Sequence, residues 1–194
     1  MKKITIILTI ALCLLSFMVI SCLTQESYNF RKTTWGMSKE EVEKAEQGTE
    51  KLLSKDEHWL GYKEIVGGLE CNLWYEFFHN KLVSAAYQFC KEYIDPDGYI
   101  YDYRHLRALL KEKYGEPNTA FSDDPTEWEE GESSYWTWWF YPNGEEENNE
   151  TGISLELYDS TDTEDKPLLQ IEYWSIKLLP WIREMEKMEA DEKL

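Results

Sequence analysis

Residues 69–90, LECNLWYEFFHNKLVSAAYQFC, contain two runs of apolar and aromatic residues separated by a short polar stretch. Aromatic and β-branched residues favour strands, and asparagine favours tight turns because it tolerates positive φ. The pattern predicts an antiparallel hairpin with a two-residue turn at Asn80 and Lys81. In that register Cys71 lies directly opposite Cys90, which predicts a cross-strand disulfide between them. Two buried free thiols are the alternative.

The sequence before this hairpin predicts a helix and one more strand. Ser38 and Glu41 form a capping box, which starts a short helix at Lys39. The apolar run at 58–66 then ends at the turn-forming pair Gly67-Gly68. A helix and three strands therefore make up the first part of the chain.

The sequence after the hairpin has the same order of elements. Residues 99–117 have apolar residues at helical spacing and are followed by three strand-like runs, at 134–141, 152–158 and 168–174. A last amphipathic segment starts near Pro180. The prediction is an α+β fold in which two αβββ repeats form one antiparallel sheet with helices on one face, plus a C-terminal helix.

The first 21 residues have two lysines followed by a long apolar run, as in an export signal. Residues 19–22, Val-Ile-Ser-Cys, resemble the lipobox of bacterial lipoproteins, in which the signal is cleaved before a cysteine that receives a diacylglycerol. The resemblance implies that Cys22 is lipidated and anchors the protein in the cell envelope, on the periplasmic side of a membrane or at the cell surface. An uncleaved membrane helix and a secreted soluble protein are the alternatives.

These features divide the chain into five parts. They are a lipoprotein signal peptide at 1–21, a tether at 22–29, a first αβββ repeat at 30–94, a second αβββ repeat at 95–177, and a C-terminal amphipathic helix with an acidic tail at 178–194. The chain after the signal is long enough for one compact domain.

The charge of the chain excludes some partners. Its 38 acidic and 20 basic residues give a net charge of −18, which repels phosphate backbones and argues against nucleic-acid binding. The acidic runs at 123–124, 127–132 and 145–150 are predicted to be solvated loops, with calcium-binding loops as the alternative. The best calcium candidate, 159–165, lacks the glycine and the distal glutamate of an EF-hand loop.

The segment Trp35-Gly36-Met37-Ser38, followed by Glu41 and Val42, resembles the start of the small lipoprotein of the β-barrel assembly machinery. The same kind of module occurs in tandem in β-lactamase inhibitor protein. Such proteins pack helices on one face of an antiparallel sheet and act by binding proteins. The resemblance implies this fold for residues 30–92 and, through the repeat, for 99–175. It carries over no contact residues.

Strand alternation predicts the faces of the sheet. We take Thr137 to mark the wetter side of the strand at 134–141, so that Trp136, Trp138 and Phe140 face the core. The register of the hairpin likewise assigns Trp74 and Phe78 to the core. The predicted partner-binding face then consists of Tyr75, Phe77, Tyr135, Trp139, Tyr141, Tyr158 and Trp174, interspersed with Glu156, Gln170 and Glu172. Alternatively, the C-terminal helix covers this face.

The sequence contains no pattern that indicates catalysis, a metal or a cofactor. The three histidines, His58, His79 and His105, do not stand at metal-binding spacing, and there is no nucleophile elbow or phosphate-binding glycine loop. Tyr and Trp edged by polar residues are typical of protein-binding surfaces. We therefore expect a non-enzymatic envelope lipoprotein that binds another envelope protein. Carbohydrate or peptidoglycan binding, and hydrolysis by paired carboxylates, are the alternatives.

Overall fold

The computed structural model describes residues 28–56, 58–95, 97–121, 134–142, 150–159 and 167–191. The predicted signal peptide, Cys22 and the acidic runs at 123–124 and 127–132 lie outside the described residues. The described part contains three helices and eight strands, in the chain order α2 (Lys39–Ala45), β1 (Lys51–Lys55), β2 (Trp59–Val66), β3 (Leu69–Phe78), β4 (Lys81–Phe89), α3 (Asp97–Tyr114), β5 (Thr119–Phe121), β6 (Ser134–Tyr141), β7 (Thr151–Asp159), β8 (Pro167–Ser175) and α4 (Leu179–Asp191).

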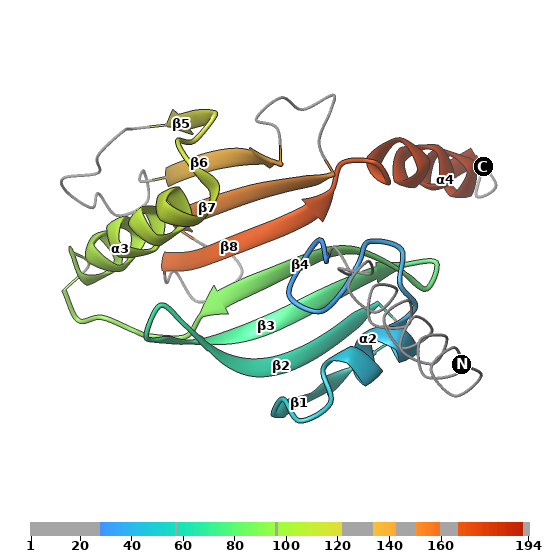
Figure 1. Ribbon diagram of the computed structural model, residues 1–194, viewed down its shortest axis with the longest axis horizontal. Coiled ribbons are helices and arrows are strands. Elements are labelled where there is room, and N and C mark those ends of the chain that lie inside the picture. Colours follow the sequence, from blue (N-terminus) through green and yellow to red (C-terminus); the bar gives the residue numbers. More distant parts are fainter. Residues whose placement is uncertain are drawn as a thin grey trace, which may run out of the picture.

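The strands form one antiparallel sheet in the spatial order β1-β2-β3-β4-β8-β7-β6-β5 (Figure 1). The last strands of the two halves, β4 and β8, pair at the centre, and α2 and α3 pack on the same face of the sheet. The predicted α+β class with helices on one face is confirmed. Each of these two helices is followed by four strands rather than the predicted three, because β1 and β5 add an outer strand to each half. A duplication of the αβββ unit stays a prediction.

The start of α2 forms as its sequence predicts. The Ser38 hydroxyl accepts a hydrogen bond from the backbone N–H of Glu41, and the Glu41 carboxylate accepts one from the backbone N–H of Ser38. Two N–H groups that lack partners within the helix are thereby satisfied. The helix buries Val42 against the sheet.

The β3–β4 hairpin turns one residue earlier than predicted. His79 and Asn80 form the turn, with φ of 47° and 56°, and Phe78 lies opposite Lys81. The register then shifts between Phe77, opposite Leu82, and Glu76, opposite Ser84, as in a β-bulge. When the pairing register of a strand shifts by one residue, the side chains that faced one side of the sheet face the other side. Leu73, Tyr75 and Phe77 therefore face the helices and are buried, and the predicted faces of β3 are reversed.

The new register also moves Cys90 out of the position opposite Cys71. Cys71 lies opposite Phe89 and is buried in the core, whereas Cys90 follows the strand and is exposed. Both thiols are free, so the predicted disulfide is wrong. Burial raises the pKa of the Cys71 thiol to about 12.

The helix-covered side of β6 carries Thr137 and Trp139, which is the reverse of the predicted core. Thr137 is buried because its hydroxyl bonds to that of Tyr103 in α3 at 2.8 Å. Trp139 is buried beside it, and its Nε1 donates to the carbonyl oxygen of Gly115 at 3.0 Å. In β7 and β8, Ile153, Leu155, Leu157, Leu169, Ile171 and Tyr173 face the helices as the alternation predicts.

Residues 29–37 cross the helix side of the sheet and join its two halves. Phe30 packs against Tyr75 and Tyr87 of the first half and against Tyr173 of the second. Trp35 Nε1 donates to the hydroxyl of Thr151 on β7 at 2.9 Å. This segment therefore belongs to the core, although it has almost no regular structure.

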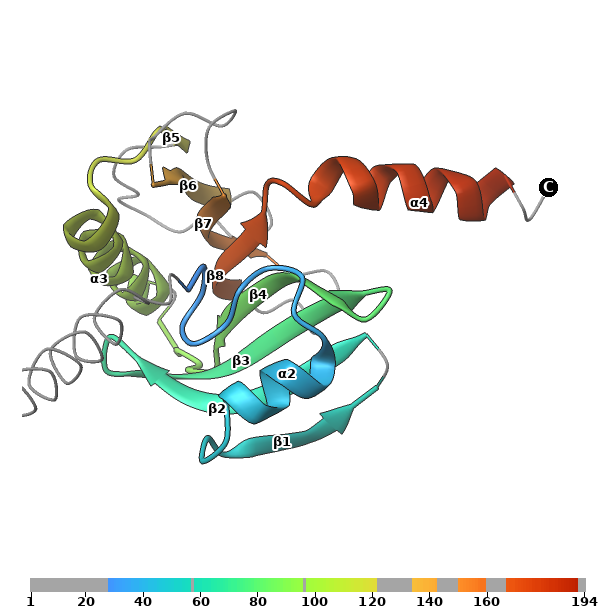
Figure 2. The same cartoon turned by 45° about the vertical axis from the view of Figure 1, so that its right-hand side comes forward.

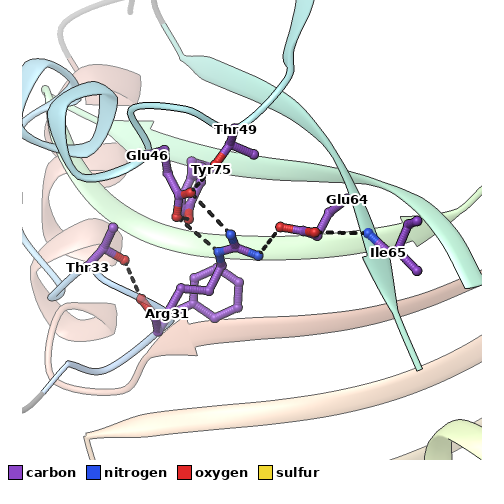
Figure 3. Close-up of polar contacts among 8 residues, drawn as sticks. Arg31, Thr33, Glu46, Thr49, Glu64, Ile65 and Tyr75 are labelled. Carbon is purple, nitrogen blue, oxygen red and sulfur yellow. Dashed lines mark hydrogen bonds and ion pairs between the residues drawn. The ribbon is translucent and has the colours of Figure 1, made fainter. Parts of the chain in front are cut away.

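Arg31 of this segment forms a polar cluster with Glu46 at the end of α2 (Figure 3). Its Nε and Nη2 donate to the two oxygens of Glu46 at 3.0 and 3.2 Å, and its Nη1 donates to Glu64 at 2.5 Å. The hydroxyls of Tyr75 and Thr49 donate to Glu46 at 2.6 and 2.9 Å. Burial alone would raise the pKa of Glu46, but the bonds from Tyr75 and Arg31 outweigh it and hold that pKa below its usual value.

Helix α4 begins against the β3–β4 hairpin and then runs away from the sheet (Figure 2). The ring of Trp181 meets that of Phe78 at 5.5 Å between centroids, and Lys81 Nζ lies 4.4 Å from the centre of the Trp181 ring. Only the first turn of α4 approaches the uncovered face of the sheet, through Leu179 and Ile182. Within the described part, no helix is both long and apolar enough to cross a membrane.

Candidate functional site

The face of the sheet opposite α2 and α3 carries a group of tryptophans. They alternate along their strands with residues of the helix-covered core, so their side chains lie on the other side. Trp59 and Trp138 are 38% and 39% exposed, and the others are half-buried. We call this surface the tryptophan face and define it by Trp59, Trp74, Trp136, Trp138 and Trp174.

Small residues on β7 allow two of these tryptophans to meet. Trp174 lies opposite Gly152, and a Cβ on that glycine would lie 2.1 Å from the indole ring, so the ring occupies the space above the glycine. Trp138 lies opposite Ser154, the next residue of β7 on this face. The rings of Trp138 and Trp174 meet edge to face, with 6.4 Å between their centroids.

A hollow of about 360 Å³ opens on the tryptophan face beside this pair. Trp138 and Trp174 line it, together with Glu76 from β3, Glu156 from β7 and Glu172 from β8. None of its lining residues is basic. We call it the glutamate hollow and define it by these five residues and Ser154.

The three glutamates have different partners. Glu76 accepts a hydrogen bond from the Ser84 hydroxyl at 2.6 Å, and Glu156 accepts one from Gln170 Nε2 at 3.1 Å. The carboxyl of Glu172 makes no hydrogen bond or ion pair with the side chains that the structure describes. Burial, and then the charges of Glu156 and Glu76, raises the pKa of Glu172 to about 7. Near neutral pH this carboxyl is therefore divided between its protonated and ionised forms.

Ser154 also lacks a partner at the base of the hollow. It is 1% exposed, and its Oγ forms no hydrogen bond within the described part of the chain. Most buried polar groups in proteins are paired, so an unpaired hydroxyl inside a hollow is an available ligand contact. Ser154 lies directly opposite Glu172 in the β7–β8 register.

A second, smaller hollow of about 260 Å³ lies further along the tryptophan face. Trp59 and Trp74 line it with Asp56 and Gln88. The buried Nε1 of Trp74 has no hydrogen-bond partner among the described residues. The tryptophan face thus offers two neighbouring sites that combine indole rings with polar side chains.

The seven residues predicted to bind a partner do not lie on one face of the sheet. Tyr75, Phe77 and Trp139 are 0%, 2% and 1% exposed beneath the helices, so their predicted surface position is wrong. Tyr135 and Tyr141 lie on the same helix-covered side; Tyr135 packs partly buried against the core, and Tyr141 is exposed beside Tyr114. The other two, Tyr158 and Trp174, lie on the uncovered face, with Glu156, Gln170 and Glu172 as predicted.

Trp74, Trp136 and Trp138 were missed as surface residues because the predicted faces of β3 and β6 were reversed. The aromatic content of β6 predicted exposed aromatic residues on that strand, and Trp138 and Tyr141 are exposed, but it could not tell which alternate residues face outward. Helix α3 covers one side of β6, and the hydrogen bond between the hydroxyls of Tyr103 and Thr137 holds the Thr137 side of the strand against that helix.

Comparison with known proteins does not assign the chain to a family, because no family model, curated protein or solved structure matches it. In the part of the chain that the structure describes, no three His, Cys, Asp or Glu side chains are grouped closely enough to hold a metal ion. The function is therefore argued from the tryptophan face itself.

Alanine at position 152 is expected to displace Trp174 from β7. The new Cβ would overlap the indole ring, and overpacking of this kind costs about 1–3 kcal/mol. Near-UV circular dichroism and urea denaturation should report the change. In the double variant G152A/W174A the added methyl group meets no indole, so the two effects should be strongly non-additive. Simple additivity would contradict the placement of Trp174 on Gly152.

Proposed function

We propose that the protein is a membrane-anchored envelope lipoprotein that binds another envelope protein through the tryptophan face and has no enzymatic activity. One observation carries the proposal: α2 and α3 pack on the other face of the sheet, and α4 reaches the tryptophan face only through its first turn, beside the glutamate hollow. Large indole rings bury much area at small cost in side-chain entropy, and their N–H groups retain a polar contact.

The proposed anchor supports a partner in the same compartment. Cys22 lies six positions before Tyr28, the first described residue, and a chain of that length spans at most about 22 Å. A domain held this close to a membrane meets membrane-bound and envelope proteins at high effective concentration. The acidic net charge of −18 favours partners with basic surfaces.

Replacement of Trp138 and Trp174 by alanine tests the proposal. In-cell cross-linking of the anchored protein, followed by identification of the captured protein, should show a loss of capture of at least about tenfold, because central interface tryptophans commonly contribute 2 kcal/mol or more. Tyr101→Ala is the matched control, since Tyr101 is a highly exposed aromatic residue on α3, away from this face. Undiminished capture by the tryptophan variants, or an equal loss with Tyr101→Ala, would refute a role for this face.

Carbohydrate or peptidoglycan binding stays the alternative. It is favoured by the second hollow, where two tryptophans stand beside the hydrogen-bonding side chains Asp56 and Gln88. Titration with N-acetylglucosamine oligosaccharides, followed by tryptophan fluorescence, separates the two functions, because only glycan binding predicts a saturable change.

A further inference from the structure

We propose that the glutamate hollow binds the ammonium group of a lysine side chain of the partner protein. The inference rests on the proposed protein-binding function and identifies the chemistry that this site recognises. The hollow, its three glutamates and the unpaired buried hydroxyl of Ser154 carry it together.

The charges and hydrogen-bonding groups of the hollow suit a ligand that only donates. It contains three carboxyl groups and no basic lining residue. Two of the donors near it are already used, because Ser84 bonds to Glu76 and Gln170 bonds to Glu156. The unpaired Ser154 hydroxyl can accept a further hydrogen bond. An ammonium group has three N–H donors, no acceptor and a positive charge, so it complements these groups, whereas a neutral sugar hydroxyl would leave the carboxylates uncompensated.

The register places two acceptors within reach of one ammonium group. Ser154 and Glu172 lie directly opposite each other, and such pairs have Cβ atoms about 4.5–5.5 Å apart. Ser154 is flanked by Glu172 on β8 and by Trp138 on β6, which lies opposite it in the β6–β7 register. Trp174 covers Gly152, the next residue of β7 on the same face. The alkyl chain of a lysine would pack along these rings, which also attract its cationic end.

The arrangement favours an ammonium group over other cations. A divalent metal needs several closely grouped ligands, and the described residues contain no such group. A guanidinium has its donors in one plane and pairs best with a single carboxylate in bidentate fashion. In the hollow the two acceptors, the Ser154 hydroxyl and the Glu172 carboxyl, lie on different strands. This arrangement suits an ammonium group, which is compact and whose N–H donors point in different directions.

The site should depend on pH through Glu172. The titratable groups that face it are Glu76 from β3 and Glu156 from β7; β4, β6 and α4 contribute no titratable lining residue. With the pKa of Glu172 raised to about 7, the ionised fraction rises about tenfold between pH 6 and pH 8. A lysine ammonium keeps its charge over this range, so its affinity should rise with pH by up to about tenfold.

The experiment titrates the full-length, anchored protein in detergent micelles with N-acetyl-lysine methylamide and follows tryptophan fluorescence and heat of binding. Saturable binding is expected in the millimolar range, with at least about tenfold weaker binding of the Nε-acetylated compound, which lacks the charge. Glu172→Gln should weaken binding of the charged compound by about tenfold or more, and Ser154→Ala by severalfold. Glu112→Gln, which neutralises an exposed carboxylate on α3, should leave it unchanged.

Equal binding of the two lysine compounds would overturn the inference. So would unchanged binding by the Glu172→Gln variant, provided that this variant keeps the circular dichroism spectrum of the folded protein. Binding of N-acetylglucosamine oligosaccharides at this site, sensitive to Glu172→Gln, would overturn it in favour of a glycan. If partner capture needs Trp138 and Trp174 but lysine does not bind, the proposed function stands and this inference fails. If lysine binds but capture does not need the tryptophans, the proposed function fails instead.

Discussion

Alanine at position 139 is expected to lower the free energy of unfolding by about 3–5 kcal/mol, the range for truncation of a buried tryptophan. Trp139 is fully buried beneath α3, and its indole N–H bonds to the carbonyl oxygen of Gly115 just after that helix. Its loss would leave both a cavity and an unpaired carbonyl group. Urea denaturation followed by far-UV circular dichroism measures the change.

The neighbouring residue provides the control. Trp138 is chemically identical but lies on the opposite face of the same strand and is 39% exposed. Trp138→Ala therefore loses less buried area and leaves no enclosed cavity, so it should cost about 1–2 kcal/mol less than Trp139→Ala. The two variants together test the faces of β6. A Trp138→Ala protein that is as unstable as the Trp139→Ala protein would show that the faces are assigned the wrong way round.

Methionine at position 31 is expected to lower the free energy of unfolding by a similar amount, about 3–5 kcal/mol, because it leaves the buried carboxylate of Glu46 without its cation. Arg31 also connects α2 to β2 through Glu64, so its loss removes contacts on two elements. Lys111→Met, which breaks an exposed ion pair with Glu116, is the control and should change stability by less than about 1 kcal/mol.

The effect of Arg31→Met should depend on pH. Folding lowers the pKa of Glu46, so its contribution to stability is present above its unfolded pKa of about 4.3 and is lost as the pH falls through the lower folded value. The variant should therefore be most destabilised near neutral pH and approach the unmodified protein as Glu46 becomes protonated. A stability difference that stays constant from pH 7 down to about pH 2, below both pKa values, would contradict a charged Glu46 in the cluster.

Local sequence signals predicted the elements that depend on local interactions. The capping box starts α2 because Ser38 and Glu41 satisfy each other's backbone groups without help from the rest of the chain. The faces of β7 and β8 were predicted correctly because Ile and Leu alternate with Ser, Glu and Gln over most of both strands. Together with the resemblance stated above, these patterns predicted the antiparallel sheet with helices on one face.

The candidate site could be predicted only in part. Glu156, Glu172 and Trp174 were correctly placed on the uncovered face, and all come from these two alternating strands. In β3 and β6 aromatic residues occupy both faces, so alternation alone does not identify the core side. The hairpin turn, one residue from its predicted position, then reversed the assignment of Tyr75 and Phe77.

By itself, the sequence determined three helices, the six longer strands and an aromatic, acidic antiparallel sheet, because hydrophobic periodicity, turn residues and helix caps act over a few neighbouring positions. Only the tertiary structure decided which aromatic residues are core and which are surface. A tyrosine hydroxyl on α3 makes burial of Thr137 favourable, and pairing of β4 with β8 brings glutamates from three strands to one hollow. Both depend on partners distant in the chain, which no local pattern records.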